Sequence, residues 1–210
     1  MKLETLVTSG KFKLDGGEWD VDNNVYIVAD DQTQHCYIVD PSHDKDAIVA
    51  AVEKLGAQVK GIILTHGHSD HIDIAPDVAE HFGVAMYMHP EDDMLWQESN
   101  PDSTYEPLAE GQTFELGKDT LEVLHTPGHS PGCVVLYNAA EGILLSGDTL
   151  FSGGPGATGR KYSDFDVIVE SLQTKVMTLP EDVRVLPGHG DATTVGAEKA
   201  RMDEYIERGY

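Results

Sequence analysis

The chain has 210 residues, a length typical of one domain built around one core. It contains 37 Asp and Glu residues against 14 Lys and Arg, which gives a formal net charge of −23, and 40% of its residues are hydrophobic. This is the composition of a folded protein, and a surface so negative repels phosphate backbones and anionic lipid. We therefore expect a single domain over residues 1–210, with neither nucleic acid nor membrane as a partner.

Two further features of the sequence indicate the compartment. The opening residues lead into no apolar stretch of the kind found in a secretory signal, and no run of eighteen apolar residues occurs. Cys36 and Cys133 are too few and too far apart to predict a disulfide framework. We expect a cytoplasmic protein; the acidic excess is also typical of salt-adapted hosts.

The first half of the chain predicts a β-hairpin followed by helices that alternate with strands. Apolar runs at 24–29 and 36–39, on either side of polar residues, predict the hairpin. The periodicity of 44–55 predicts a helix that ends at Gly56, and the apolar run 61–65 is typical of a strand covered on both faces. A helix over 76–82, a strand over 84–88 and a helix over 91–98 follow.

The second half predicts a further group of strands and two helices. The strands fall at 113–116, 121–125, 133–137, 143–146 and 183–186. Ser163 and Asp166 have the spacing of a capping box, which predicts a helix from there to about residue 179, and a closing helix is predicted over 195–208. Successive hairpins are an antiparallel feature, so this order favours an α/β fold of the αββα type over a parallel doubly wound sheet. In such a sandwich, two mixed β-sheets pack face to face and helices cover their outer faces.

Four metal-type donors follow the strand at 61–65 within six residues: His66, His68, Asp70 and His71. Imidazole and carboxylate groups are common metal ligands, and the small residues between them let the loop wrap closely around an ion. Residues two apart can point the same way from an extended turn, and the later pair aims at a neighbouring point. One short stretch can therefore serve two metals.

Three more donors, each next to glycine, follow other predicted strands: His129, Asp148 and His189. Strand ends at one edge of a sheet converge, which is how sites are commonly assembled on rigid scaffolds. A lone His after a strand is usually structural, but four such loops in one chain favour a metal centre.

The four loops, T-H-G-H-S-D-H, T-P-G-H-S-P-G, G-D-T-L-F and P-G-H-G, resemble those of the metallo-β-lactamase superfamily, and within it the glyoxalase II-type hydrolases (hydroxyacylglutathione hydrolase-type). The likeness covers nearly the whole chain and implies the metallo-β-lactamase fold with two divalent metal ions. The ligands that it implies are His66, His68 and His129 at site 1, Asp70, His71 and His189 at site 2, and Asp148 as the bridge between the ions.

The resemblance also implies roles beyond the ligands. Asp40 would steady the ligand loop through hydrogen bonds, and its alternative role is to cap the helix that follows it. Arg160, Lys161 and Tyr162 follow a glycine-rich segment and are candidate substrate contacts, with a solvated loop as the alternative. Because 21 residues follow His189, too few for the family's C-terminal glutathione-binding region, no glutathione contacts are transferred.

The donor set contains imidazole and carboxylate but no thiolate, which suits zinc, iron or manganese, and zinc is the expected metal. Two ions can share a water and lower its pKa toward neutrality while one of them polarises a carbonyl. A thioester suits such a site because a thiolate leaves with little or no acid catalysis. We therefore expect a dinuclear hydrolase of a small acyl thioester, with a metal-bridging hydroxide as nucleophile and Asp70 as a further candidate for proton acceptor.

Three alternatives share this pattern. Persulfide dioxygenases look similar but use one iron, so the number of bound metals separates such an iron oxidoreductase from the dinuclear hydrolase. Lactone or ester hydrolysis uses the same chemistry on the same fold. A non-enzymatic scaffold would bind metal and hydrolyse nothing.

Overall fold

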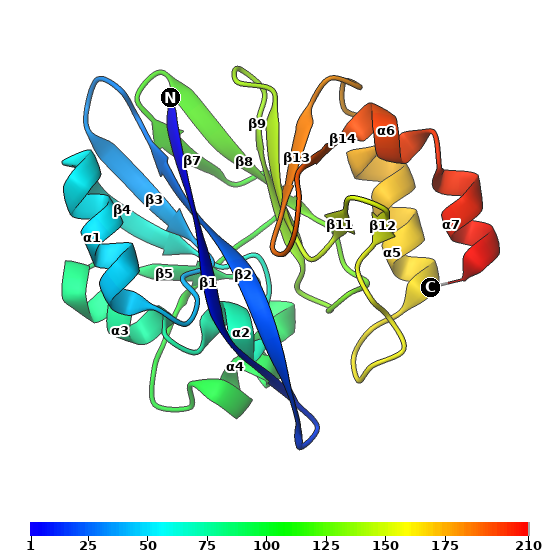
Figure 1. Ribbon diagram of the computed structural model, residues 1–210, viewed down its shortest axis with the longest axis horizontal. Helices are drawn as coiled ribbons and strands as arrows, with labels where there is room; N and C mark the ends of the chain where they lie inside the picture. Colours follow the sequence, from blue (N-terminus) through cyan, green and yellow to red (C-terminus); the bar gives the residue numbers. More distant parts are fainter. Residues whose placement is uncertain (210) are drawn as a thin grey trace.

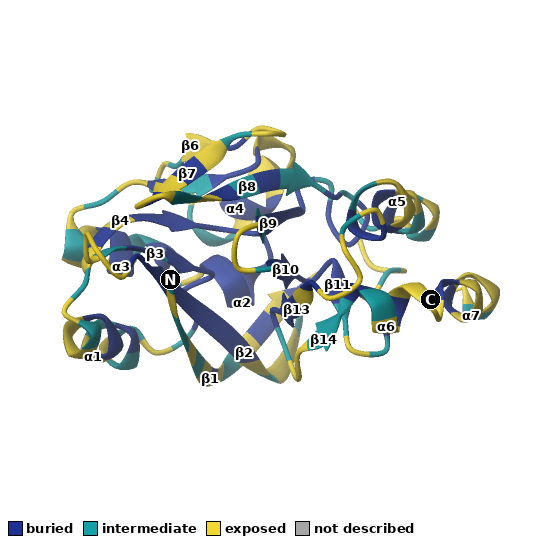
Figure 2. Ribbon diagram, turned by 90° about the horizontal axis from the view of Figure 1, so that it is seen from above, coloured by how far each residue is buried: buried dark blue, intermediate teal, exposed yellow. Residues whose placement is uncertain are grey.

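Two six-stranded mixed β-sheets packed face to face form the centre of the molecule in the computed structural model (Figure 1). The structure describes residues 1–209; Tyr210, the last residue of the predicted domain, lies outside the described residues. Helices pack on the outer face of each sheet (Figure 2). The predicted αββα sandwich is therefore confirmed.

The first sheet contains β1 (Lys2–Leu14), β2 (Gly17–Ala29), β3 (His35–Val39), β4 (Gln58–Ile63), β5 (Met86–Met88) and β6 (Glu106–Pro107), in that order. The second has the order β14 (Thr193–Thr194), β13 (Arg184–Pro187), β10 (Ile143–Gly147), β9 (Val134–Asn138), β8 (Asp119–His125) and β7 (Thr113–Leu116). Strands β1 to β3 pair antiparallel and β3 to β6 pair parallel. In the second sheet β10 and β13 are parallel and the other pairs are antiparallel.

Two sets of helices cover this double sheet. The first set contains α1 (Lys45–Leu55), α2 (Ser69–Ile72), α3 (Ala75–Phe82) and α4 (Asp93–Ser99), and the second contains α5 (Phe165–Ser171), α6 (Val195–Lys199) and α7 (Met202–Arg208). A 3-10 turn at Pro90–Asp92 precedes α4, a π-helical turn at Leu172–Val176 follows α5, and a short hairpin of β11 (Leu150–Phe151) and β12 (Gly154–Pro155) follows β10. No helix within residues 1–209 is long and apolar enough to span a membrane.

Three apolar layers hold the sandwich together. Val39 and Ile63 of the first sheet pack against Leu136 of the second between the sheets. Ile48 of α1 lies in the layer outside the first sheet, and Tyr205 of α7 lies in the layer outside the second. Both faces of the central strands are therefore buried, which explains their near-continuous apolar runs.

The predicted hairpin over 24–29 and 36–39 is confirmed as the antiparallel pair β2–β3, but its first strand is longer than predicted. β1 and the first part of β2 are not predicted, although Asp15 and Gly16 close the hairpin between them with φ angles of 50° and 77°. Asp-Gly is a strong hairpin signal. The flanking strands carry many half-exposed polar residues, so they lack the apolar alternation by which strands are usually found.

Two helix predictions in the second half need correction. Asp164 caps α5 by accepting a hydrogen bond from the N–H of Val167, whereas Ser163 Oγ closes a turn on the backbone of Arg160. The capping box predicted at Ser163 is therefore wrong, because that hydroxyl is already engaged. The closing helix predicted over 195–208 is divided into α6 and α7, with a break at Arg201 (φ −112°).

This topology brings five strand ends to one edge of the sandwich. In the first sheet β3 and β4 run parallel, and in the second β8, β10 and β13 run in one direction. The loops that follow these strands carry every donor that the sequence predicts. The arrangement of the strands therefore brings the donors together without any need for contacts among the donors themselves.

Candidate metal centre

Three imidazoles from two of these loops form the first group of donors. His66 and His68 follow β4, and His129 lies in the loop after β8. Nδ1 of His68 lies 3.0 Å from Nε2 of His66 and 2.9 Å from Nε2 of His129, and all three side chains are buried. Nδ1 has either one proton or one lone pair, so it cannot form a full hydrogen bond with both neighbours. A cation bound by three lone pairs satisfies all three rings.

A second group lies beside the first. Nε2 of His71 and Nε2 of His189 are 3.3 Å apart, and Oδ2 of Asp70 lies 3.4 Å from the former and 3.3 Å from the latter. Asp70 and His71 belong to the short helix α2, and His189 follows β13. Two imidazoles and a carboxylate at these distances can hold a second cation.

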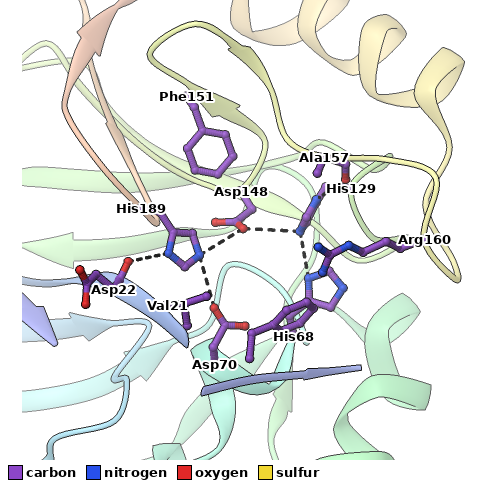
Figure 3. A pocket seen from close by; sticks show the side chains of 11 residues that line it. Val21, Asp22, His68, Asp70, His129, Asp148, Phe151, Ala157, Arg160 and His189 are labelled. Atoms are coloured by element: carbon purple, nitrogen blue, oxygen red, sulfur yellow. Dashed lines mark hydrogen bonds and ion pairs between the residues drawn. The ribbon is translucent and has the colours of Figure 1, made fainter. Parts of the chain in front are cut away.

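Asp148, directly after β10, lies between the two groups. Its Oδ2 is 3.5 Å from Nε2 of His129 and 3.4 Å from Nε2 of His189, and its Oδ1 is 3.5 Å from Nε2 of His71. Oδ1 is buried and has no hydrogen-bond partner. Figure 3 shows the side chains of His68, Asp148 and His189 pointing toward one another. A buried carboxylate oxygen without a hydrogen bond fits a metal ligand, because otherwise its burial is costly.

The far nitrogen of several rings is held by the surrounding chain. Nδ1 of His129 lies 2.8 Å from the carbonyl oxygen of Ala157, and Nδ1 of His189 lies 2.7 Å from the carbonyl oxygen of Asp22. A carbonyl oxygen only accepts, so each Nδ1 carries a proton and Nε2 is the nitrogen that faces the centre. This is how metal-binding histidines are usually oriented.

Asp40 holds the loop after β4 in the same way. Its Oδ1 accepts the N–H of Thr65 (2.7 Å), and its Oδ2 lies 2.6 Å from Oγ1 of Thr65 and 3.0 Å from Nδ1 of His71. The cap of α1 is Asp44, whose side chain accepts the N–H of Ala47. The alternative role of Asp40 as a helix cap is therefore wrong.

Burial and charge divide the imidazoles into two kinds. Burial, reinforced by neighbouring rings, lowers the pKa of His68 to about 3 and that of His66 well below its ordinary value. Burial also acts to lower the pKa values of His71 and His189. Nearby carboxylates outweigh it, raising the pKa of His71 to about 9 and that of His189 to about 11. His66 and His68 therefore offer free lone pairs at neutral pH, whereas His71 and His189 hold protons that a cation would displace.

The pKa values of the two carboxylates are lowered, whereas burial alone raises the pKa of an acid. Burial acts to raise the pKa of Asp70, but His71 and the hydrogen bonds from His189 and Asn23 lower it to about 2. The pKa of Asp148 is likewise held well below its ordinary value, chiefly by His71 and His189 against the effect of burial. Both acids are ionised at neutral pH, as metal ligands must be.

A cavity of about 360 Å³ opens onto both groups. Phe12, Val21 and Phe151 form its apolar wall, and the ring of Phe12 lies edge-on to His68 with centroids 5.2 Å apart. The guanidinium of Arg160 lies 4.9 Å from the ring centroid of Phe12 and 4.9 Å from that of Trp19. No carboxylate within residues 1–209 forms an ion pair with this arginine. The cavity therefore has metal-type donors at its base and a stacked cation in its wall.

The other two candidate substrate contacts lie elsewhere. Nζ of Lys161 pairs with Glu98 (3.1 Å) and Asp15 (3.9 Å), and Tyr162 lies under that ammonium group. Neither residue lines the cavity. Of the three consecutive residues predicted, the structure brings Arg160 alone to the centre.

The structure adds residues that the sequence does not predict. Asn23 donates from Nδ2 to Oδ2 of Asp70 (2.9 Å), and its Oδ1 faces Nε2 of His43 at 2.8 Å. Phe12 lines the cavity and Trp19 stacks on Arg160, and both come from the hairpin that the sequence analysis misses. That hairpin's Asp-Gly turn is the signal that could have indicated them.

A further group of donors, His89, Glu91 and His125, lies outside this centre. The two imidazole rings are stacked, with centroids 3.9 Å apart and planes 13° apart. Lone pairs in two parallel planes cannot both point at one ion. This arrangement agrees with a structural role for both histidines.

The comparisons with known proteins agree with this geometry. The sequence profile of the metallo-beta-lactamase superfamily matches residues 19–189, a range that includes all four donor loops. Hydroxyacylglutathione hydrolase GloC of Haemophilus influenzae is 32% identical over 190 residues, which cover 84% of this chain and 89% of that protein.

Solved structures show the same likeness. The crystal structure of TTHA1623 in a di-iron-bound form matches with a TM-score of 0.77 and 30% identity, over 87% of this chain and 94% of that one. The BLEG-1 B3 metallo-beta-lactamase matches with a TM-score of 0.76 and 28% identity, over 93% of this chain and 97% of that one. With its sandwich of two mixed sheets and its His and Asp donors at the strand ends, the chain belongs to the metallo-β-lactamase superfamily.

Proposed function

We propose that the chain is a dinuclear metal-dependent hydrolase of small acyl thioesters. In this proposal His66, His68 and His129 would hold one ion, Asp70, His71 and His189 would hold the other, and Asp148 would be shared by both. Zinc is the metal that we expect. Iron is the main alternative, supported by the similarity to a protein solved in a di-iron-bound form, and manganese suits the same donors.

The position of Asp148 carries the proposal. One of its oxygens lies within 3.5 Å of Nε2 of His129 and of Nε2 of His189, which belong to different groups. A centre for a single iron has no need of a second complete set of donors beside the first. The complete second group therefore supports a pair of ions over the single iron of a dioxygenase.

When bound, two such ions would lower the pKa of a shared water and polarise the scissile carbonyl. The chain itself supplies the position of the reacting groups. Asp70 is the proposed acceptor for the proton of the attacking water, and Asn23 holds its carboxylate by donating to Oδ2. Phe12 and Phe151 shield this point from bulk solvent, which strengthens the electrostatic interactions within it.

The lining of the cavity supports a thioester as the substrate. Apart from the proposed ligands, Asp22 and Arg160 are the lining residues with titratable side chains. A thiolate, whose parent thiol has a pKa of about 8.5, leaves without being protonated more readily than an alkoxide or an amide anion, whose parent acids are much weaker. The similarity to GloC, a hydroxyacylglutathione hydrolase, supports the same substrate class.

Arg160 is the proposed contact for an anionic part of the substrate. The chain carries a net charge of −23 and therefore repels anions over most of its surface. At the cavity this repulsion is offset by the stacked guanidinium, which no carboxylate of the described chain neutralises. Bidentate hydrogen bonds from guanidinium to a carboxylate are strong and directional.

The proposed function is tested by elemental analysis of the purified protein together with a panel of thioester, lactone, ester, β-lactam and persulfide substrates. We expect two ions per chain and the highest kcat/KM for a thioester. One iron per chain with oxygen consumption on a persulfide would contradict the proposal. Faster turnover of a lactone, an ester or a β-lactam would refute the thioester assignment, and bound metal without any turnover would indicate a scaffold.

Asp148→Ala should lower metal content and hydrolysis together. Outer partners of metal ligands cost about 10–100-fold when removed, so loss of a bridging ligand should reduce kcat by at least about 100-fold. Asp191→Ala is the matched control, because this exposed acid belongs to the loop of His189 and lies outside the cavity lining. Activity that survives in Asp148→Ala after both ions are lost would disprove the dinuclear mechanism.

Arg160→Ala should raise KM more than it lowers kcat, because binding to a remote anionic group is equal in the ground and transition states. A hydrogen bond to a charged group contributes about 1.5–3 kcal/mol, so we expect KM to rise roughly tenfold or more. Lys199→Ala removes one positive charge from a surface pair with Glu181 and controls for net charge. If Arg160→Ala has the same kinetics as Lys199→Ala, Arg160 does not contribute to substrate binding.

Metal binding to the stripped protein should release protons at pH 7. His71 and His189 have raised pKa values and are protonated there, whereas a metal ligand must be neutral. Lowering the pH from 8 to 6 should therefore weaken binding at the second group more than at the first, where His66 and His68 stay neutral. Calorimetry in buffers of different ionisation enthalpy measures the protons released. Equal pH dependence of the two binding steps would contradict this assignment.

A further inference from the structure

A buried carboxylate that is not among the proposed ligands lies under the first group. Asp92, in the turn before α4, is completely buried. Its Oδ2 accepts hydrogen bonds from the N–H of Gly67 (2.7 Å) and from Oγ of Ser130 (2.6 Å), and its Oδ1 accepts the N–H of Gly132 (2.6 Å). No Lys or Arg within residues 1–209 forms an ion pair with it. Three hydrogen bonds are therefore its main compensation for burial.

The three donors come from two separate loops. Gly67 lies between His66 and His68, and Ser130 follows His129 directly. One carboxylate therefore joins the two loops that supply the whole first group, next to every ligand in it. These loops are more than sixty residues apart in sequence.

The two glycines pack against Asp92 more closely than other residues could. A Cβ at Gly67 would lie 3.0 Å from Cβ of Asp92, and a Cβ at Gly132 would lie 2.7 Å from Cγ of Asp92. Both distances are at or below the closest approach of real Cβ atoms. The backbone of each loop thus rests directly on this side chain, which leaves little freedom in the separation of the loops.

The second group is held by different partners. His71 faces Asp40, and His189 faces the carbonyl oxygen of Asp22. An apolar side chain in place of Asp92 would avoid the cost of a buried charge but would leave the three buried donors unpaired. What a carboxylate adds at this point is a set of fixed acceptors for the N–H and O–H groups of both ligand loops.

We propose that Asp92 is a positioning residue of the metal centre: its carboxylate clamps the 66–68 loop to the 129–132 loop and sets the spacing of the three imidazoles. This inference rests on the proposed function, in which these imidazoles bind a metal. It assigns Asp92 to the first group and predicts that the second group is independent of it.

The test is a titration of the metal-stripped chain with Co²⁺, which reports both the stepwise affinities and the ligand-field absorption of each ion. Asp92→Asn keeps the shape but turns one acceptor into a donor that faces another donor. We expect the affinity of the first group to fall about 10–100-fold with a shifted absorption band, and that of the second to change less than threefold. The same titration of His189→Ala, in which only the first group is complete, identifies which binding step belongs to the first group.

Two further variants separate positioning from folding. Ser130→Ala removes one of the three donors and should lower the first-group affinity several-fold. Asp30→Asn is the matched control, because Asp30 also accepts two N–H groups and a hydroxyl, from Gln32 and Thr33, in the loop at the opposite end of β3 from Asp40. It should lower the melting temperature and leave both affinities unchanged.

The outcomes distinguish this inference from the function on which it rests. A wild-type chain that binds two cobalt ions, with unchanged affinity and spectrum in Asp92→Asn and Ser130→Ala, would overturn the inference alone. Equal weakening of both groups would also overturn it. If Asp92→Asn does not fold, the first-group affinity of Ser130→Ala tests the inference in its place. A wild-type chain that binds no cobalt would refute the proposed function together with the role of Asp92.

Discussion

Asp70 and Asp148 place two ionised carboxylates in the interior, where no Lys or Arg of the described chain pairs with them. Charge in such a position is costly unless it is compensated by hydrogen bonds or by opposite charge. The surrounding imidazoles provide that compensation either as protonated groups or as fellow ligands of a cation. The same attraction raises the pKa values of His71 and His189. The arrangement of the whole centre follows from this balance.

The scaffold holds these groups together through backbone as much as through side chains. Carbonyl oxygens of Ala157 and Asp22 fix the rings of His129 and His189. Close packing by glycine contributes as well: a Cβ at Gly156 would lie 1.8 Å from the carbonyl oxygen of Asp148. A side chain there would displace the loop that carries Asp148, the proposed bridging residue. Precise spacing of metal donors thus depends on residues that never touch a metal.

The cavity wall contains a cation that could contact the proposed anionic substrate of this acidic chain. Phe12 and Trp19 belong to the β1–β2 hairpin, and both rings stack on the guanidinium of Arg160, which comes from the loop after β12. Stacking on aromatic faces holds a guanidinium in place and leaves its N–H groups free. Lys161, the next residue, is instead neutralised by Glu98 and Asp15. Of these neighbouring cations, the one without a carboxylate partner faces the proposed reaction site.

The sequence alone is sufficient to predict the donor loops and the layered architecture. His66, Asp148 and their companions stand beside glycine at the ends of apolar strands, and both the strand and the turn are local signals that a few neighbouring residues determine. The predicted sandwich follows from the order of hairpins and helices for the same reason. The prediction is wrong where one local pattern is compatible with two structures, as at Ser163. Its hydroxyl closes a turn, and Asp164 caps the helix instead.

What the tertiary structure decided is which distant groups meet. In the sequence, Asp92 is one of several acidic residues before a helix. The three groups that donate hydrogen bonds to it lie 25 to 40 residues away in the chain. Likewise, Arg160 and Lys161 are simply adjacent cations in the sequence. In the fold, aromatic rings stack on Arg160, whereas carboxylates pair with Lys161. Pairings of this kind depend on the packing of whole sheets and loops, because the energy of each contact arises only when both partners have been placed.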